Sequence, residues 1–221
     1  MTYSSSLATK MKLIMAAGEL YAEQGIQHIT VRAIARRSGE NMGSIKYHFG
    51  DKDGLLAAVL DFATERLQHD PLGVCLAQNR SLLQTKIGQC RLIAGLVELF
   101  MKIIFDHEKP TWCLKLVSQV LQGNLPVSQQ LFDHCATPII RVFTTVHQAI
   151  TGECNPAAAF AWMTITISPM YTLSIDNSIT RHIYYNQPIP PAAMTALKNM
   201  AIRGALVNLG LWDHQLESEL P

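Results

Sequence analysis

The spacing of apolar residues constrains the fold of this 221-residue chain more than any other feature. Apolar side chains recur every three or four residues through most of the chain, and runs that alternate polar with apolar residues do not occur. The first pattern places apolar side chains on one face of a helix, whereas a half-buried strand needs the second pattern. We therefore predict an all-α fold.

A capping residue and a glycine predict two short helices that are separated by a tight turn. Thr30 can cap a helix over 31–38, because its side-chain oxygen can accept a hydrogen bond from the first turn. Gly39 ends that helix, and another short helix begins about three residues later, near Met42. Two short helices joined in this way form a helix-turn-helix.

Longer helices precede and follow this motif. We expect the first helix over 8–24, ended by Gly25, and the fourth over 52–69, capped by Asp51 and followed by Pro71. The spacing of apolar residues and the positions of proline and glycine predict further helices over 82–106, 111–122, 128–150, 156–185 and 191–209. The chain thus divides into a small N-terminal domain over 1–60 and a larger helical domain over 61–221.

Positive charge is concentrated in the helix-turn-helix, although the whole chain carries a net charge of only +1. Residues 32–52 contain two acidic side chains, Glu40 and Asp51. The same stretch contains five basic side chains: Arg32, Arg36, Arg37, Lys46 and Lys52. A local excess of positive charge attracts a polyanion, so we expect nucleic acid to bind here.

The third helix carries polar side chains that can donate hydrogen bonds to phosphates or base edges: Ser44, Lys46, Tyr47 and His48. We expect Ile45 and Phe49 to hold this helix against its own core. Gly43 has no side chain, so the start of the helix can approach DNA closely.

Residues 13–56, LIMAAGELYAEQGIQHITVRAIARRSGENMGSIKYHFGDKDGLL, resemble the N-terminal domain of the TetR family of transcriptional regulators, of the TetR/AcrR type. The stretches ENMGSI and YHFGDKDGLL resemble most the branch related to the CecR and CerR regulators. The resemblance implies a transcriptional regulator that binds double-stranded operator DNA and is released by a small, largely apolar effector.

Matched by position, the family's DNA contacts fall on Thr30, Arg32, Met42, Gly43, Ser44, Lys46, Tyr47, His48 and Lys52. This sequence differs from many members in one respect, because Lys46 stands where they have a tyrosine and its own tyrosine is the next residue, Tyr47. We expect both side chains to contact phosphate. Base reading then falls to Arg32 and Ser44, with His48 as a further candidate.

The resemblance also implies a homodimer that forms through the last two long helices, within residues 156–209. The residues favour this independently: 156–175 carries no charge and requires burial, and Gly204 permits close approach of another helix. We expect no membrane partner, because the same uncharged stretch contains too many polar residues and prolines for a helix that faces lipid.

Candidates for the effector pocket are polar, aromatic or flexible side chains set in apolar helices: Trp112, Gln119, His134, Arg141, His147, Trp162, Met163 and Tyr171. Arg141 stands among apolar neighbours over 139–143, so it must reach water, pair with a carboxylate or hold an anionic ligand.

No phosphate-binding loop, nucleophile elbow or zinc-protease motif occurs, so we expect neither an enzyme nor a cofactor. The five cysteines have no paired spacing, which favours a cytoplasmic protein with buried free thiols. The alternative is a helical interaction protein, or a metal or redox sensor, with a degenerate helix-turn-helix; a metal switch would use His134, His147 and a cysteine.

Overall fold

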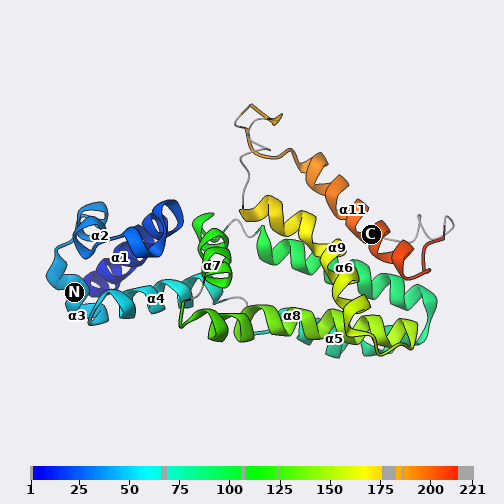
Figure 1. The fold of residues 1–221 in the computed structure, drawn as a ribbon. Coiled ribbons are helices and arrows are strands. Elements are labelled where there is room, and N and C mark those ends of the chain that lie inside the picture. The colour runs from blue at the N-terminus through cyan, green and yellow to red at the C-terminus, as the bar shows by residue number, and fades with distance from the viewer. Residues whose placement is uncertain are drawn as a thin grey trace. The chain divides into compact units, whose positions relative to one another are not determined.

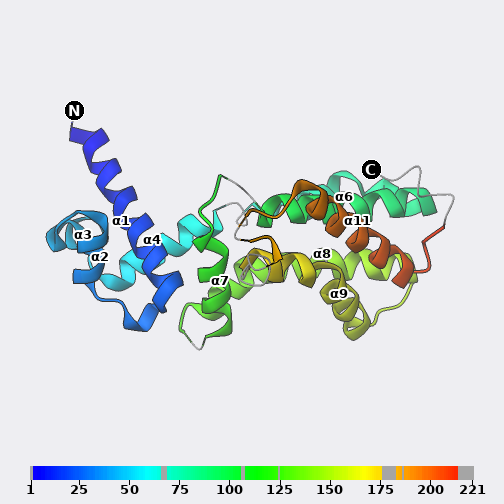
Figure 2. The same cartoon turned by 90° about the horizontal axis from the view of Figure 1, so that it is seen from above.

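The computed structural model describes residues 2–65, 69–105, 108–123, 125–175, 183–185 and 187–213. Throughout these ranges the chain forms α-helices and two short 3-10 helices and contains no strand, which confirms the all-α prediction (Figures 1 and 2). The α-helices are α1 (Thr2–Gln24), α2 (Val31–Ser38), α3 (Met42–Phe49), α4 (Lys52–Thr64), α5 (Pro71–Gln78), α6 (Lys86–Ile104), α7 (Trp112–Gln122), α8 (Ser128–Thr151), α9 (Pro156–Ile175) and α11 (Pro191–Asn208). The 3-10 helices are η1 (Ile26–His28) and η2 (Arg80–Gln84).

The sequence missed α5, because Pro71 was expected only to follow the fourth helix. Proline is compatible with the first position of a helix, where its missing N–H has no partner to lose. Asp70 caps α5 by accepting a hydrogen bond from the backbone N–H of Gly73 at 3.0 Å. The expected fourth helix is described as far as Thr64, and the expected helix over 156–185 ends at Ile175; residues 66–68 and 176–182 lie outside the described residues.

Contacts within the chain define two compact units. The first consists of residues 1–65 and 107–131, and the second of 66–106 and 132–221. The sequence placed 107–131 with the later domain, since nothing local in this segment indicates which helices it contacts. The functional division at residue 60 stays a prediction.

The core of the first unit is formed where α1 meets α2, α3 and α4. One face of α1 and the inner faces of the three other helices supply side chains that are essentially inaccessible to solvent: Leu13, Ala17, Tyr21, Ile34, Ile45, Leu55 and Val59. Burial of these apolar surfaces is the main force that holds the short helices α2 and α3 in place, because helices of this length are marginal alone.

Helix α7 packs on α1 and α4 within the first unit. The ring of Trp112 lies so close to Gly18 that a β-carbon at this glycine would collide with it. On its other side Trp112 stacks with Phe62, with 5.9 Å between ring centroids. Gln119 donates a side-chain hydrogen bond to the carbonyl of Ala22 at 3.1 Å. Gly18 is therefore the residue that allows α7 to pack against α1.

In the second unit, α9 and α11 pack on α6 and on each other. The indole N–H of Trp162 donates to the carbonyl of Ala205 at 3.0 Å and fixes α9 to α11. Phe143 of α8 lies 5.5 Å from the same indole, measured between ring centroids. Lys198 of α11 forms an ion pair with Glu98 of α6 at 2.5 Å.

Ionisation of Tyr21 lowers the stability of the first unit at alkaline pH. Its hydroxyl is buried and has no hydrogen-bond partner among the described residues. Burial, reinforced by the negative charge of Asp53, raises the pKa of Tyr21 to about 12. A group whose pKa is raised on folding contributes fully below its unfolded pKa, about 10, and its contribution is lost as pH rises through the folded value.

We therefore expect the free energy of unfolding to fall by up to about 2.7 kcal/mol between pH 10 and 12 because of Tyr21. The Tyr21→Phe variant should lack this part of the decrease and should be no less stable at pH 7. Urea unfolding of both proteins at several pH values measures the difference. An identical alkaline decrease in the two proteins would contradict the assignment to Tyr21.

Candidate nucleic-acid interface

The predicted helix-turn-helix is present in α2 and α3, and side-chain caps start both helices. The hydroxyl oxygen of Thr30 accepts a hydrogen bond from the backbone N–H of Ala33 at 3.2 Å. The carboxamide oxygen of Asn41 accepts one from the backbone N–H of Ser44 at 2.9 Å. Gly39 ends α2 with φ of 73°, a left-handed conformation that glycine adopts without strain.

Burial on one side of each helix determines which side chains face outward. Ile34 and Ala35 of α2 are buried, as is Ile45 of α3. Phe49 is half-buried, and the ammonium of Lys10 lies 5.9 Å from the centre of its ring. The expected anchoring role of Ile45 and Phe49 agrees with this geometry.

The structure brings most of the predicted contact residues together on the outer side of α2 and α3. Exposed members are Thr30, Arg32, Met42, Gly43, Lys46 and Tyr47, while Ser44, His48 and Lys52 are half-buried. Tyr47 has 81% of its surface exposed. Its ring and the ring of His48 meet edge to face, with 4.9 Å between ring centroids. A tyrosine this exposed contributes little to the fold, so its surface is available to a partner.

A shallow hollow of about 570 Å³ lies between the start of α2 and the start of α3. Its lining residues are Thr30, Arg32, Ala33, Ala35, Arg36, Asn41 and Met42. Two arginines on consecutive turns of one helix therefore border the same concave surface. Such a surface suits an extended anion.

The five basic side chains of the motif have different environments. Arg37 is held by two carboxylates of α1, at 3.0 Å from Glu23 and 3.3 Å from Glu19, so its charge is already compensated. Arg32, Arg36 and Lys46 are exposed and form no ion pair with the described residues. Of the acidic side chains, Glu40 is compensated by Lys12 at 3.2 Å.

Lys52 has a structural partner inside the first unit. Its ammonium donates a hydrogen bond to the backbone carbonyl of Ile26 at 2.9 Å, so it connects the start of α4 to η1. An ammonium has three N–H donors, and this contact uses one of them. The remaining donors can still reach a phosphate.

Arg36, Asn41 and Lys10 belong to this surface or border it but were not among the predicted contact residues. Arg36 follows Arg32 by four residues, and this helical spacing could have identified it, because residues four apart share one face of a helix. Lys10 lies 39 positions before Phe49 in the sequence, so only the packed structure places the two side by side.

The eight effector-pocket candidates are divided between the two units. Trp112 and Gln119 belong to the first unit, where both take part in the packing of α7. Of the others, His147 and Trp162 are neighbours, with 5.9 Å between ring centroids. Met163 is buried, Tyr171 is half-buried and His134 is exposed. Arg141 is exposed and pairs with Asp70 at 3.1 Å.

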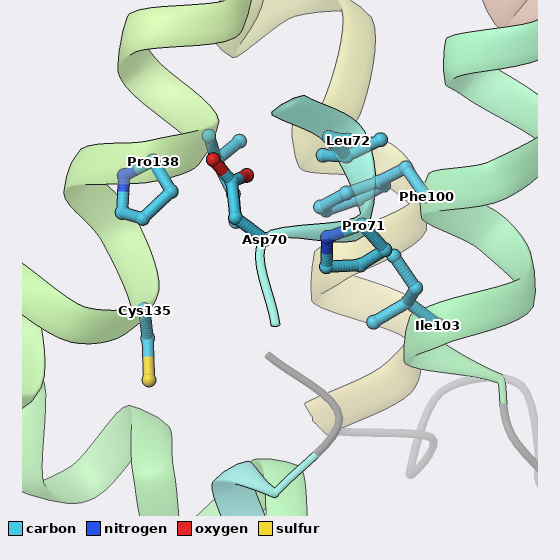
Figure 3. A pocket seen from close by; sticks show the side chains of 8 residues that line it. Asp70, Pro71, Leu72, Phe100, Ile103, Cys135 and Pro138 are labelled. Carbon is cyan, nitrogen blue, oxygen red and sulfur yellow. The ribbon is translucent and has the colours of Figure 1, made fainter. Parts of the chain in front are cut away.

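A crevice in the second unit separates α5 and α6 from α8 (Figure 3). The α5–α8 crevice is lined by Asp70, Pro71, Leu72, Phe100, Ile103, Cys135, Pro138 and Ile139. Its volume is about 10 Å³, enough for one water molecule. In this conformation the crevice is closed to any larger ligand.

Histidines and cysteines do not assemble into a metal site in the described part of the chain. No group of three His, Cys, Asp or Glu side chains lies close enough there to hold an ion. Cys90, Cys113 and Cys135 are buried as expected, but Cys75 is half-buried and Cys154 is exposed. Burial raises the pKa of the Cys135 thiol to about 11, so this thiol is protonated and unreactive at neutral pH.

Comparison with known proteins relates the helix-turn-helix to one family. Residues 13–59 match the family model described as "Bacterial regulatory proteins, tetR family". The transcriptional repressor AcnR of Corynebacterium glutamicum is 24% identical over 145 residues, which are 66% of this chain and 61% of the relative. The repressor Rv3405c of Mycobacterium tuberculosis is 44% identical over 55 residues, 25% of this chain and 29% of the relative. The chain thus spans less than two thirds of the length of these curated relatives.

Solved structures extend the similarity of the fold over nearly the whole chain. A TetR-family regulator from Mesorhizobium loti gives a TM-score of 0.54 at 15% identity and covers 93% of this chain and 97% of its own. SmeT, the repressor of a Stenotrophomonas maltophilia multidrug efflux pump, gives 0.54 at 16% identity and covers 90% of this chain and 88% of its own. The assignment to the CecR and CerR branch stays a prediction.

The cap at Asn41 sets the start of α3, so we predict that Asn41→Ala lowers the free energy of unfolding by about 1 kcal/mol. Asn41→Ser, which keeps a side-chain acceptor, should retain most of the stability. Urea denaturation at pH 7 measures both variants. Equal losses in the two variants would mean that the cap does not stabilise α3.

Proposed function

We propose that this chain is a cytoplasmic transcriptional repressor of the TetR family of bacterial regulatory proteins and that it releases operator DNA when it binds a small effector. The observation that carries the proposal is the uncompensated positive charge on α2 and α3 in a chain with a net charge of only +1. Families of this type are not enzymes, and the site contributes contacts rather than a reaction.

In this proposal α3 enters the major groove and α2 lies across the backbone. Arg32, which is exposed, reads base edges together with Ser44 and His48, which are half-buried. Lys46 and Tyr47 contact phosphates. Exposed Gly43 permits the backbone at the start of α3 to come close to the duplex. Arg36 adds a phosphate contact from the hollow, and Lys52 one from the start of α4.

The proposed partner subunit is a second copy that packs on α9 and α11, within residues 156–209. Helix α9 is apolar and long enough to cross a membrane by length and composition alone, yet only 28% of that stretch is buried. Large apolar side chains stand exposed on both helices: Phe160, Ile165, Met200 and Val207. A second copy would cover this surface, which favours a four-helix contact between subunits over a lipid-facing role.

Effector binding would change the distance between the two α3 helices of the dimer, one from each subunit. Recognition helices of a dimer read successive major-groove faces only at a separation near one helical turn, about 34 to 36 Å. An effector held by residues 61–221 that prefers another spacing shifts the population away from the DNA-bound form. We propose that the pocket candidates of the second unit hold this effector: His134, Arg141, His147, Trp162, Met163 and Tyr171.

The charge environments predict which of two neighbouring arginines contacts DNA. We expect Arg36→Ala to lower the slope of log affinity against log salt by about one for a mixed-sequence duplex. Arg37→Ala should leave the slope unchanged, because Glu19 and Glu23 already compensate this charge. Fluorescence anisotropy at several salt concentrations measures both slopes.

A wild-type protein without salt-dependent DNA affinity would instead support the alternative, an interaction protein with a degenerate helix-turn-helix. Equal slopes for the two variants would show that the ion pairs of Arg37 do not determine which arginine binds phosphate.

The dimer proposal is tested at Gly204 of α11. A β-carbon there would have open space in the isolated subunit, because no side chain and no other helix lies within 4 Å of it. We expect Gly204→Leu to be monomeric at micromolar concentration, because the added side chain overpacks the contact between subunits. Gly204→Ala should remain dimeric, and circular dichroism should show unchanged helicity in both. Sedimentation velocity makes the comparison, and a monomeric wild type would contradict the proposal.

A further inference from the structure

Arg141 forms an ion pair with Asp70, and Asp70 is one of the residues that line the α5–α8 crevice. One guanidinium nitrogen of Arg141 donates to one carboxylate oxygen of Asp70 at 3.1 Å, and this is their single contact. The other nitrogens of the guanidinium have no partner among the described residues. Because 66% of the Arg141 side chain is exposed, this pair is of the kind that contributes little to stability and is easily replaced.

Asp70 adopts an unfavourable backbone conformation at this point. Its φ of 43° and ψ of 60° are left-handed, which is rare for residues other than glycine. Two contacts hold it there: the cap to the N–H of Gly73 at 3.0 Å and the ion pair to Arg141. Loss of the ion pair would remove one of the two contacts that hold this conformation.

Apart from Asp70, the side chains that line the crevice carry no charge and are mostly apolar. Figure 3 shows Cys135 and Pro138 on the α8 side, Phe100 and Ile103 on the α6 side, and Asp70 between them. Cys135 adds no charge, because its buried thiol stays protonated at neutral pH. A cation paired with a residue that lines an apolar crevice matches a ligand with an anionic head and an apolar chain.

We propose that the α5–α8 crevice binds an organic carboxylate with an apolar chain, whose carboxylate replaces that of Asp70 on Arg141 while the chain enters between α6 and α8. The site already holds one carboxylate against the guanidinium, so the ligand supplies the same chemical group. A free carboxylate can engage two guanidinium nitrogens at once, whereas Asp70 engages one. Release of Asp70 opens the crevice, which in its paired state has room for only about one water molecule.

The regulatory consequence rests on the proposed repressor function. Asp70 follows the last residue of α4, Thr64, by six positions, and it also caps α5. A ligand that frees Asp70 from Arg141 therefore changes the chain just beyond the helix-turn-helix domain. We expect this change to lower DNA affinity.

The test uses the full chain and decanoate as the probe, with decan-1-ol as its uncharged counterpart. Isothermal titration calorimetry should show decanoate binding at least tenfold tighter than decanol. Arg141→Gln should lose at least tenfold of the decanoate affinity. Asp70→Asn, which keeps a helix-capping oxygen but not the competing charge, should bind decanoate more tightly than wild type. Arg91 is an exposed arginine of α6 that does not line the crevice. The Arg91→Gln variant is therefore the matched control and should bind decanoate as wild type does.

Absence of decanoate binding, or equal affinity in wild type and Arg141→Gln, would overturn the proposal. DNA binding is measured separately by anisotropy, with and without decanoate. Salt-dependent DNA binding together with no Arg141-dependent binding of decanoate would reject the crevice site and leave the repressor function standing. Arg141-dependent binding of decanoate in a protein that does not bind DNA would reject the repressor function alone.

Discussion

Burial of one side of α2 and α3 against α1 and α4 is the constraint on which the interface depends. Each of these two helices has only eight residues, too few to be stable in isolation. Ile34 and Ile45 anchor them in the core, and the caps at Thr30 and Asn41 define where they begin. The anchored faces leave Arg32, Lys46 and Tyr47 outside by exclusion. The outer surface is therefore determined by the core beneath it.

Ion pairs refine this surface further. The motif is rich in basic residues, but α1 supplies carboxylates that compensate Arg37 and a lysine that compensates Glu40. These pairs join α2 and the following turn to α1, and they leave Arg32, Arg36 and Lys46 as the uncompensated basic side chains of α2 and α3. Charge in the linear sequence thus separates into a structural part and an available part once the helices pack.

Local signals predicted the helices well where they were strong. Capping residues and glycines gave the turn between α2 and α3 almost to the residue, because each acts on its own neighbours in the chain. The same rules missed α5, where Pro71 acts as a first helical residue behind the cap of Asp70. The candidate pocket was predicted less well, because whether Trp112 faces a ligand or Gly18 depends on contacts almost a hundred positions apart. Long-range packing of this kind leaves no local pattern.

The place of Trp112 has a consequence for how the protein is made. The first unit closes only when α7 packs on α1 and α4, but 66–106 are synthesised between these segments. During translation the helix-turn-helix emerges early, before Trp112 of α7 can cover α1 at Gly18. A segment of the second unit therefore leaves the ribosome before the first unit is complete, so residues 1–65 and α7 can come together only after 66–106 have been synthesised.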